Sequence, residues 1–266
     1  MVGAVDARHP ADPQLISEVA ARVRLLAEDY RPPEFADAPG PDAALFLCAI
    51  DHRSGYRRAY LVGGKGPYDG SALIWALACA AERRSPGMLS AASLADVDGR
   101  RVEELFRVGG ETVSGSEGRA GLWRDLASGL GERYEGSAEA LIAAAESRLG
   151  GPGGLIARLA DFEAFADPLA KKSFLFAKIA ARRGWLTVAD SDNWEVCADN
   201  VLMRLALRSG LVHPGPVEVV REASRTALKR VALTAGLEPP VLDDLLWELG
   251  RRAPDLLGTA GGHDLD

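Results

Sequence analysis

An aspartate interrupts an apolar stretch near position 199. In EVCADNVLMRLALRSGLV, residues 195–212, apolar residues precede and follow Asp199. Aspartate is among the best N-cap residues, and Leu202 and Leu205 share one helical face before Gly210 stops the pattern. The sequence therefore predicts a helix that Asp199 caps. A carboxylate kept ionised at a helix N-terminus can also stabilise the oxocarbenium ion that develops when a glycosidic bond breaks.

Two adjacent lysines form the second chemically interesting feature. They lie in FADPLAKKSFLFAKIAARRGW, residues 165–185. Asp167 is a natural N-cap and Pro168 suits the first helical position, so the segment predicts a helix that carries Lys171 and Lys172.

The two lysines fall on different faces of this expected helix. At 100° per residue, Lys171 joins Lys178 and Arg182 on a solvated face. Lys172 instead lies at the edge of the apolar stripe, beside Phe176. Either its stem covers apolar surface while the amine reaches water, or the amine points into a cleft where burial and neighbouring charges tune it.

Most of the chain has a helical pattern. Ala, Leu, Arg and Glu are plentiful, and runs of β-branched residues are scarce. An apolar segment, AALFLCAIDHRSG at 43–55, fits a buried helix better than a strand. Further helices are expected at 12–30, 71–83, 93–107, 117–133, 136–149 and 153–163. The predicted fold class is all-α.

A glycine-rich segment, LVGGKGPYDG, occupies residues 61–70. It is not a P-loop, because Lys65 is followed by Gly66 rather than by Ser or Thr and no clear strand precedes it. Tight turns explain the glycines better than phosphate binding does.

The domain organisation is expected to be simple. Residues 1–12 form a flexible arm, residues 13–256 form one helical domain, and residues 257–266 form a disordered tail. The sequence GGPGG at 150–154 is either a boundary between two lobes or an ordinary turn.

Composition limits the classes of function. The chain has 266 residues, 47% of them hydrophobic and 26% charged, with a net charge of −7. This acidic balance disfavours a protein that binds the nucleic-acid backbone. The three cysteines are far apart, the longest apolar stretch is too short to span a bilayer, and the N-terminus lacks signal-peptide features. These features indicate a cytoplasmic protein without a structural metal site.

The two segments together resemble part of the helix-hairpin-helix DNA glycosylases. In that family a helix bearing a lysine precedes, by a few tens of residues, a helix opened by a catalytic aspartate. The matching pieces here are Lys172-Ser173 and residues 197–212. The DNA-gripping hairpin just before the lysine is missing, and FADPLA stands in its place.

More of the chain is similar to the queuosine salvage proteins, which share the helical glycosylase-like fold. The order and spacing of short motifs match over roughly 70–250. The similar segments are YDGSALIWALACAAER (68–83), VEELFR (102–107), YEGSAEALIAAAE (134–146), FEAFAD (162–167), AKKSFLFAKIA (170–180), CADNVLMRLALRSGLV (197–212), VEVVREAS (217–224) and LDDLLWELG (242–250).

The chain departs from that family at several positions. Where the family has Lys-Arg-Ala-Gln, residues 171–174 read Lys-Lys-Ser-Phe. Where it has Phe-Ala-Asp-Tyr-Arg, residues 197–201 read Cys-Ala-Asp-Asn-Val, and its aromatic-rich N-terminal segment is replaced by IDHRSGY. The aspartate is retained while the base-recognition residues differ. The chain therefore resembles a divergent member of the family, and its substrate is expected to differ from queuosine itself.

The resemblance implies a two-lobed helical N-glycosidase that hydrolyses the bond between ribose, with or without a 5′-phosphate, and a purine-like or 7-deazapurine base. Asp199 and Lys172 would be catalytic, and no metal or organic cofactor is implied. Trp75 would serve mainly in core packing. The substrate-binding candidates are Tyr68, Lys171, Trp194, Asn200 and Arg221.

Two alternatives stay open at this point. One is a DNA repair glycosylase in which Lys172 is the nucleophile and Asp199 its helper. The other is a helical protein that binds nucleosides without catalysis. For the preferred interpretation the partner is a small nucleoside or nucleoside 5′-monophosphate, with no stable binding to duplex DNA and no membrane; the oligomeric state is left open.

Overall fold

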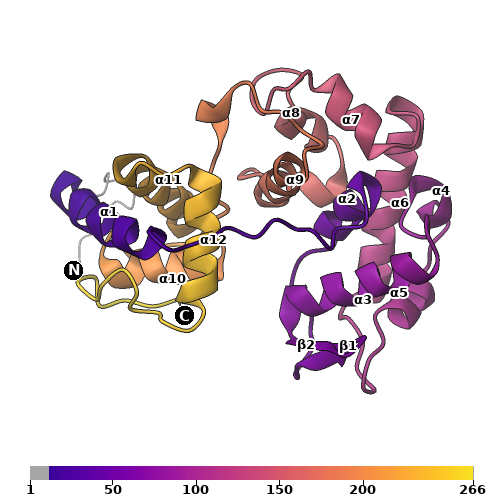
Figure 1. The fold of residues 1–266 in the computed structure, drawn as a ribbon, viewed down its shortest axis with the longest axis horizontal. Coiled ribbons are helices and arrows are strands. Elements are labelled where there is room, and N and C mark those ends of the chain that lie inside the picture. The colour runs from indigo at the N-terminus through magenta and orange to yellow at the C-terminus, as the bar shows by residue number, and fades with distance from the viewer. Residues whose placement is uncertain (1–11, 266) are drawn as a thin grey trace. The chain divides into compact units, whose positions relative to one another are not determined.

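The computed structural model describes residues 12–265 and is mostly helical (Figure 1). Most of the predicted N-terminal arm lies outside the described residues. The chain divides into two compact units. The central unit is Glu34–Ser191, and the terminal unit joins the described residues before Glu34 to those from Asp192 onward. Residues 150–154, for which the sequence left a lobe boundary and an ordinary turn open, form a turn inside the central unit.

The terminal unit is built from one N-terminal helix and three C-terminal helices. They are α1 (Pro13–Ala27), α10 (Asn200–Ser209), α11 (Val217–Ala235) and α12 (Pro239–Gly250). Helix α1 packs against α11, and α10 packs against both α11 and α12. Asp12 caps α1 as its sequence predicts, since its carboxylate accepts a bond from the Gln14 N–H at 2.9 Å. Val23, Leu202, Leu228 and Leu246 lie in the shared apolar core.

The central unit contains the remaining helices and one hairpin. Its elements are α2 (Pro41–Ala49), β1 (Tyr60–Val62), β2 (Lys65–Tyr68), α3 (Gly70–Arg84), α4 (Ala91–Leu94), α5 (Gly99–Leu105), α6 (Ser116–Arg133), α7 (Ala138–Ala144), α8 (Leu155–Leu159), the 3-10 helix η1 (Glu163–Phe165) and α9 (Lys171–Arg182). A further 3-10 helix, η2 (Ser191–Asn193), spans the boundary between the two units.

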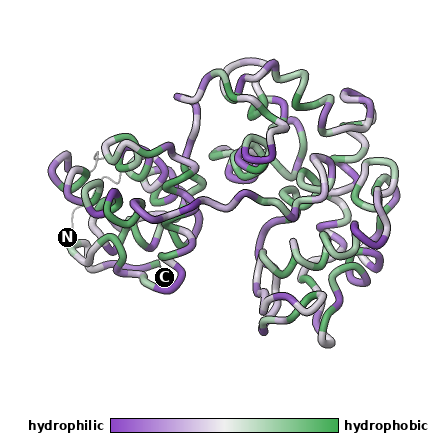
Figure 2. The backbone as a smooth tube through the Cα atoms, viewed as in Figure 1, coloured by the Kyte–Doolittle hydropathy of each residue, from purple (hydrophilic) through white to green (hydrophobic). Residues whose placement is uncertain are grey.

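Helix α2 is the buried centre of this unit. Every residue from Ala43 to Ile50 is buried, and α2 packs against α3, α6, α7 and α9. The Trp123 indole N–H also donates to the Phe46 carbonyl at 2.7 Å. A helix covered on all sides needs no polar face, which explains its continuous apolar sequence. The prediction of a helix here is confirmed. Figure 2 shows that hydrophobic residues also lie within helices of both units.

The glycine-rich segment has the expected tight turn together with strands that its sequence does not show, and the helix expected at 93–107 is interrupted. The glycine-rich segment forms an antiparallel hairpin, with Tyr60 opposite Tyr68 and a two-residue connection at Gly63-Gly64. Both glycines have positive φ, which this tight connection requires. The strands are too short to show a period in the sequence. The helix expected at 93–107 is divided into α4 and α5, because Asp98 starts a new helix by accepting from the Arg101 N–H.

Helix α9 begins later and is more buried than its sequence indicates. It starts at Lys171, although the Asp167 carboxylate does accept from the Lys171 N–H at 3.2 Å. Lys178, expected on the solvated face, is only 4% exposed, so that prediction is wrong. Because α9 packs against α2, α8 and η1, neighbouring elements cover more of its surface than one apolar stripe suggests.

The C-terminal segment is not disordered in this structure. Leu257 is buried, and the Gly261 N–H donates to the Arg208 carbonyl at 2.9 Å. The expectation of a disordered tail rested on small and polar residues, whereas Asp264 forms ion pairs with arginines of α10. None of the helices in residues 12–265 combines the length and the apolar character needed to cross a membrane.

Candidate functional site

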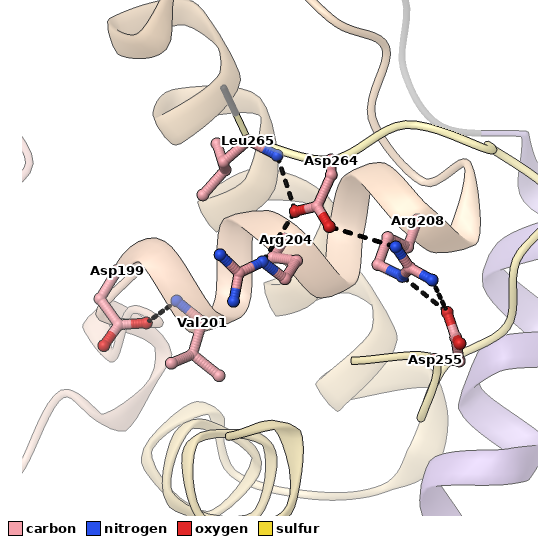
Figure 3. Close-up of polar contacts among 7 residues, drawn as sticks. All are labelled: Asp199, Val201, Arg204, Arg208, Asp255, Asp264 and Leu265. Carbon is pink, nitrogen blue, oxygen red and sulfur yellow. Dashed lines mark hydrogen bonds and ion pairs between the residues drawn. The ribbon is translucent and has the colours of Figure 1, made fainter. Parts of the chain in front are cut away.

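Asp199 is the N-cap of α10. Its Oδ1 accepts hydrogen bonds from the backbone N–H groups of Val201 at 2.9 Å and Leu202 at 3.1 Å, and Figure 3 shows the first of these. The residue is extended, and its side chain is partly exposed. Gly210 ends the helix in the left-handed conformation. Both predicted helix ends are therefore confirmed, and the carboxylate has a fixed orientation.

The irregular segment before Asp199 is held by side chains of α11 and α12. The buried carboxylate of Asp243 accepts from the Cys197 N–H at 3.0 Å. Arg221 Nε donates to the Ala198 carbonyl at 3.4 Å. These contacts hold the two residues immediately before the N-cap, so tertiary contacts as well as the helix itself fix the place of Asp199.

Glu195 gives the same segment an ionic anchor on α11. Its carboxylate lies 3.1 Å from Arg225 Nε and 2.8 Å from Lys229 Nζ, and all three side chains are largely buried. Lys229 Nζ also donates to the Asp192 carbonyl at 3.1 Å. Partly buried charges linked in this way restrict the backbone more than isolated surface pairs do.

The other predicted binding residues of the terminal unit have different surroundings. Asn200 is exposed at the first position of α10, and Arg221 is half-buried on α11. Trp194 is only 5% exposed, so its ring packs inside the unit and offers little surface on which a base could stack. Of the three, the structure brings Arg221 to the segment that leads into Asp199.

Lys172 lies in the central unit and its amine is directed inward. Its Nζ donates to the carbonyl of Ala49, the last residue of α2, at 2.6 Å and lies 3.4 Å from His52 Nδ1. A cation at this position interacts favourably with the negative end of the helix dipole. The amine therefore contacts protein atoms, whereas the cleft considered for it stays a prediction.

The polar surroundings of Lys172 shift two pKa values. Burial is the main cause that lowers the pKa of Lys172 to about 8; Asp51 opposes the shift, and the charges of Arg119 and Lys171 contribute to it. Burial, Arg119 and Lys172 lower the pKa of His52 to about 4. His52 is therefore neutral near pH 7, and close to pH 8 the lysine exists in both charged and neutral forms.

A buried arginine organises this region. Arg119, on α6, is 1% exposed. Its guanidinium donates to the carbonyls of Ser114 at 2.8 Å, His52 at 2.7 Å, Arg53 at 2.8 Å, and to that of Ile50. Sequence reasoning identified neither Arg119 nor His52. The periodicity of polar and apolar residues cannot reveal them, because Arg119 contacts Ile50 and His52, which lie more than sixty positions away in the sequence.

Of the remaining predicted residues of the central unit, Lys171 acts on Lys172 through its charge. Tyr68 ends β2, is half-buried and pairs with Tyr60. Lys171 is half-buried at the start of α9. Trp75, on α3, is also half-buried rather than fully in the core. Lys172 belongs to the central unit and Asp199 to the terminal unit.

Metal-ligating side chains do not cluster in residues 12–265: no three of His, Cys, Asp and Glu lie together in a way that could hold an ion. All three cysteines are buried. In comparisons with models of known protein families and with curated proteins, the chain matches none.

Proposed function

We propose that this protein is an N-glycosidase of the queuosine-salvage type, which hydrolyses the bond between ribose and a purine-like or 7-deazapurine base. One observation carries the proposal: Asp199 is a partly exposed N-cap carboxylate whose Oδ1 accepts two backbone hydrogen bonds. Backbone donors stabilise the charged form of a carboxylate and restrict its rotation. Such a group is suited to face positive charge that develops on a sugar ring.

The reaction needs one water molecule and no redox partner. As the bond from the anomeric carbon to the base nitrogen breaks, positive charge spreads over that carbon and the ring oxygen. Asp199 stabilises this oxocarbenium ion or orients the attacking water. The water oxygen bonds to the anomeric carbon, one of its protons ends on the released base, and the sugar keeps the hydroxyl.

The proposal includes the helical DNA-glycosylase-like fold. Support comes from the mostly helical structure and from its division into two compact units. It also comes from the order of short motifs that resembles queuosine salvage proteins over roughly 70–250.

The function is tested by measuring base release. Purine and 7-deazapurine nucleosides, each with and without a 5′-phosphate, are incubated with the protein, and free base is separated by chromatography. Base release from at least one of them supports the proposal. Binding detected by calorimetry without any release would instead indicate the non-catalytic alternative.

Lys172→Met is expected to lower base release strongly, because the resemblance to queuosine salvage proteins assigns Lys172 a catalytic role. It should also destabilise the central unit by about 1 kcal/mol, because the Ala49 carbonyl loses its charged donor. Methionine keeps the apolar stem, so little packing is lost. Lys171→Met, at the adjacent position, should have the smaller effect on both. Turnover and urea unfolding check the pair, and a larger loss in Lys171→Met would mean that the wrong lysine has been assigned to the reaction.

A second candidate, a glycosylase with a lysine nucleophile, is favoured by one observation. The pKa of Lys172, lowered to about 8 mainly by burial, leaves part of the amine neutral and nucleophilic. Borohydride reduces the imine that such an amine forms with the sugar. A trapped adduct at Lys172 would establish this mechanism. Complete hydrolysis without an adduct favours direct attack by water.

Tight binding to duplex DNA is not expected. With a net charge of −7, affinity at physiological salt should be no better than roughly 10⁻⁴ to 10⁻⁶ M, the range of non-specific binding. Fluorescence anisotropy with labelled duplexes, intact and damaged, measures it. A nanomolar dissociation constant for damaged duplex would favour the repair glycosylase over the nucleotide hydrolase.

A further inference from the structure

The chain after α12 folds back along α10. We call residues 254–265 the C-terminal strap. Its Asp264 joins two arginines of α10: Oδ1 lies 2.7 Å from Arg204 Nε, and Oδ2 lies 3.1 Å from Arg208 Nη1 (Figure 3). Arg208 also donates through Nε to Asp255 at 2.6 Å. Two strap carboxylates therefore hold the exposed side of the helix that Asp199 caps.

A close backbone contact shows that the strap has a fitted place on α10. The Gly261 N–H donates to the Arg208 carbonyl at 2.9 Å, satisfying one of the last carbonyls of the helix. A Cβ atom at Gly261 would lie 2.0 Å from the Leu207 carbonyl oxygen and 2.6 Å from the Gly210 nitrogen. Only glycine allows this approach, so the contact is specific rather than a chance position of the chain.

Apolar residues anchor the strap on both sides of its ionic part. Leu257 is 3% exposed and belongs to the core of the terminal unit. Leu256 and Leu265 are partly buried and pack against the same core. Asp264, between Leu257 and Leu265, is less protected: its side chain is 46% exposed, and those of its partners Arg204 and Arg208 are 44% and 28% exposed.

We propose that the C-terminal strap regulates the site at Asp199 in response to ionic strength, by controlling how firmly α10 is held. This inference rests on the proposed function of Asp199. Salt screens partly exposed ion pairs, since the Debye length falls from about 8 Å at physiological ionic strength to about 3 Å at 1 M. Screening leaves the apolar anchors in place, so the strap loosens over α10 without unfolding the unit.

Hydrogen exchange tests the strap without any substrate. In Asp264→Asn, the amides of α10 should exchange about two- to fivefold faster at low salt, as expected from the loss of partly exposed ion pairs. In the wild type, 1 M salt should produce the same increase. Asp161→Asn is the matched control, because Asp161 pairs with Arg133 at 3.1 Å in the central unit. Unchanged exchange of α10 in Asp264→Asn would overturn the inference.

A charge swap separates electrostatics from packing. Arg204→Asp and Asp264→Arg, each alone, place like charges together and should speed the exchange of α10. The double variant restores an opposite pair at positions 204 and 264 but also places a positive charge beside Arg208. It should therefore recover part of the slow exchange, together with salt sensitivity, relative to either single variant. Failure of the double variant to recover either property, when both single variants are folded, would contradict an ionic strap.

Turnover then tests regulation. The value of kcat should fall in Asp264→Asn and lose its salt dependence, while KM changes little. If Asp199→Asn retains full turnover, the proposed function fails, but the exchange experiment still tests the strap. Suppose that Asp199→Asn is inactive and that α10 exchange responds as expected. An unchanged kcat in Asp264→Asn would then overturn the regulatory role of the strap, while the proposed function would stand.

Discussion

Asp199→Asn is expected to lower the rate of base release by roughly 10²–10³-fold, the loss typical when one electrostatic stabiliser of a transition state is removed. The amide has no negative charge to place against an oxocarbenium ion. Its oxygen can still accept from the N–H groups of Val201 and Leu202, as the carboxylate does. The free energy of unfolding should therefore fall by at most about 1 kcal/mol. Turnover and urea unfolding measure the two effects separately.

A matched N-cap variant controls for the structural effect. Asp98 caps α5 in the central unit through the Arg101 N–H at 2.8 Å. Asp98→Asn should cost a similar small amount of stability and leave base release unchanged. If Asp199→Asn turns over substrate at nearly the wild-type rate, the carboxylate has no catalytic role. If both variants lose activity together with stability, the loss comes from weakened helix capping.

Helix α10 could be predicted from sequence because its determinants are local. Asp199 starts the helix through bonds to residues two and three positions later, and Gly210 ends it with a positive φ. The apolar positions between them face the core as their spacing predicts, with Leu202 and Leu205 buried. Capping and periodicity act within a few residues, so they can be recognised in one sequence without knowledge of the fold.

The organisation of the two units could not be predicted in the same way. Helix α1 has a recognisable apolar face, with Val19 and Val23 buried. Nothing in that face shows that its partner is α11, near the other end of the chain. The contacts of the strap could not be predicted either. Asp264 belongs to a polar C-terminal sequence, and nothing in that sequence indicates an ion pair with Arg204, sixty positions earlier.

The surroundings of Lys172 were only partly predictable. Helical periodicity correctly separated Lys172 from a simple solvated face, yet it placed Lys178 on that face although Lys178 is buried. Periodicity describes one helix at a time, whereas burial depends on what packs around it. The contacts of Lys172 with Ala49 and His52 join residues at least 120 positions apart.

Arg119→Met should cause the largest loss of stability, about 3–4 kcal/mol in the free energy of unfolding of the central unit. The guanidinium donates to four carbonyls, and each lost hydrogen bond costs roughly 1 kcal/mol. The buried Ile50 carbonyl, in particular, cannot gain a water in exchange without local opening. Urea unfolding followed by tryptophan fluorescence measures the change, since Trp123 lies buried one turn later on α6.

Two companion variants distinguish geometry from charge. Arg119→Lys keeps the positive charge but cannot reach four carbonyls with one ammonium group, so it should recover only a minor part of the lost stability. Arg100→Met removes an arginine whose side chain is 83% exposed and should change stability by less than about 0.5 kcal/mol. A loss in Arg119→Met as small as that of Arg100→Met would contradict the role assigned to the buried guanidinium. Full stability in Arg119→Lys would instead mean that positive charge alone holds residues 50–53, and that the planar arrangement of donors adds nothing.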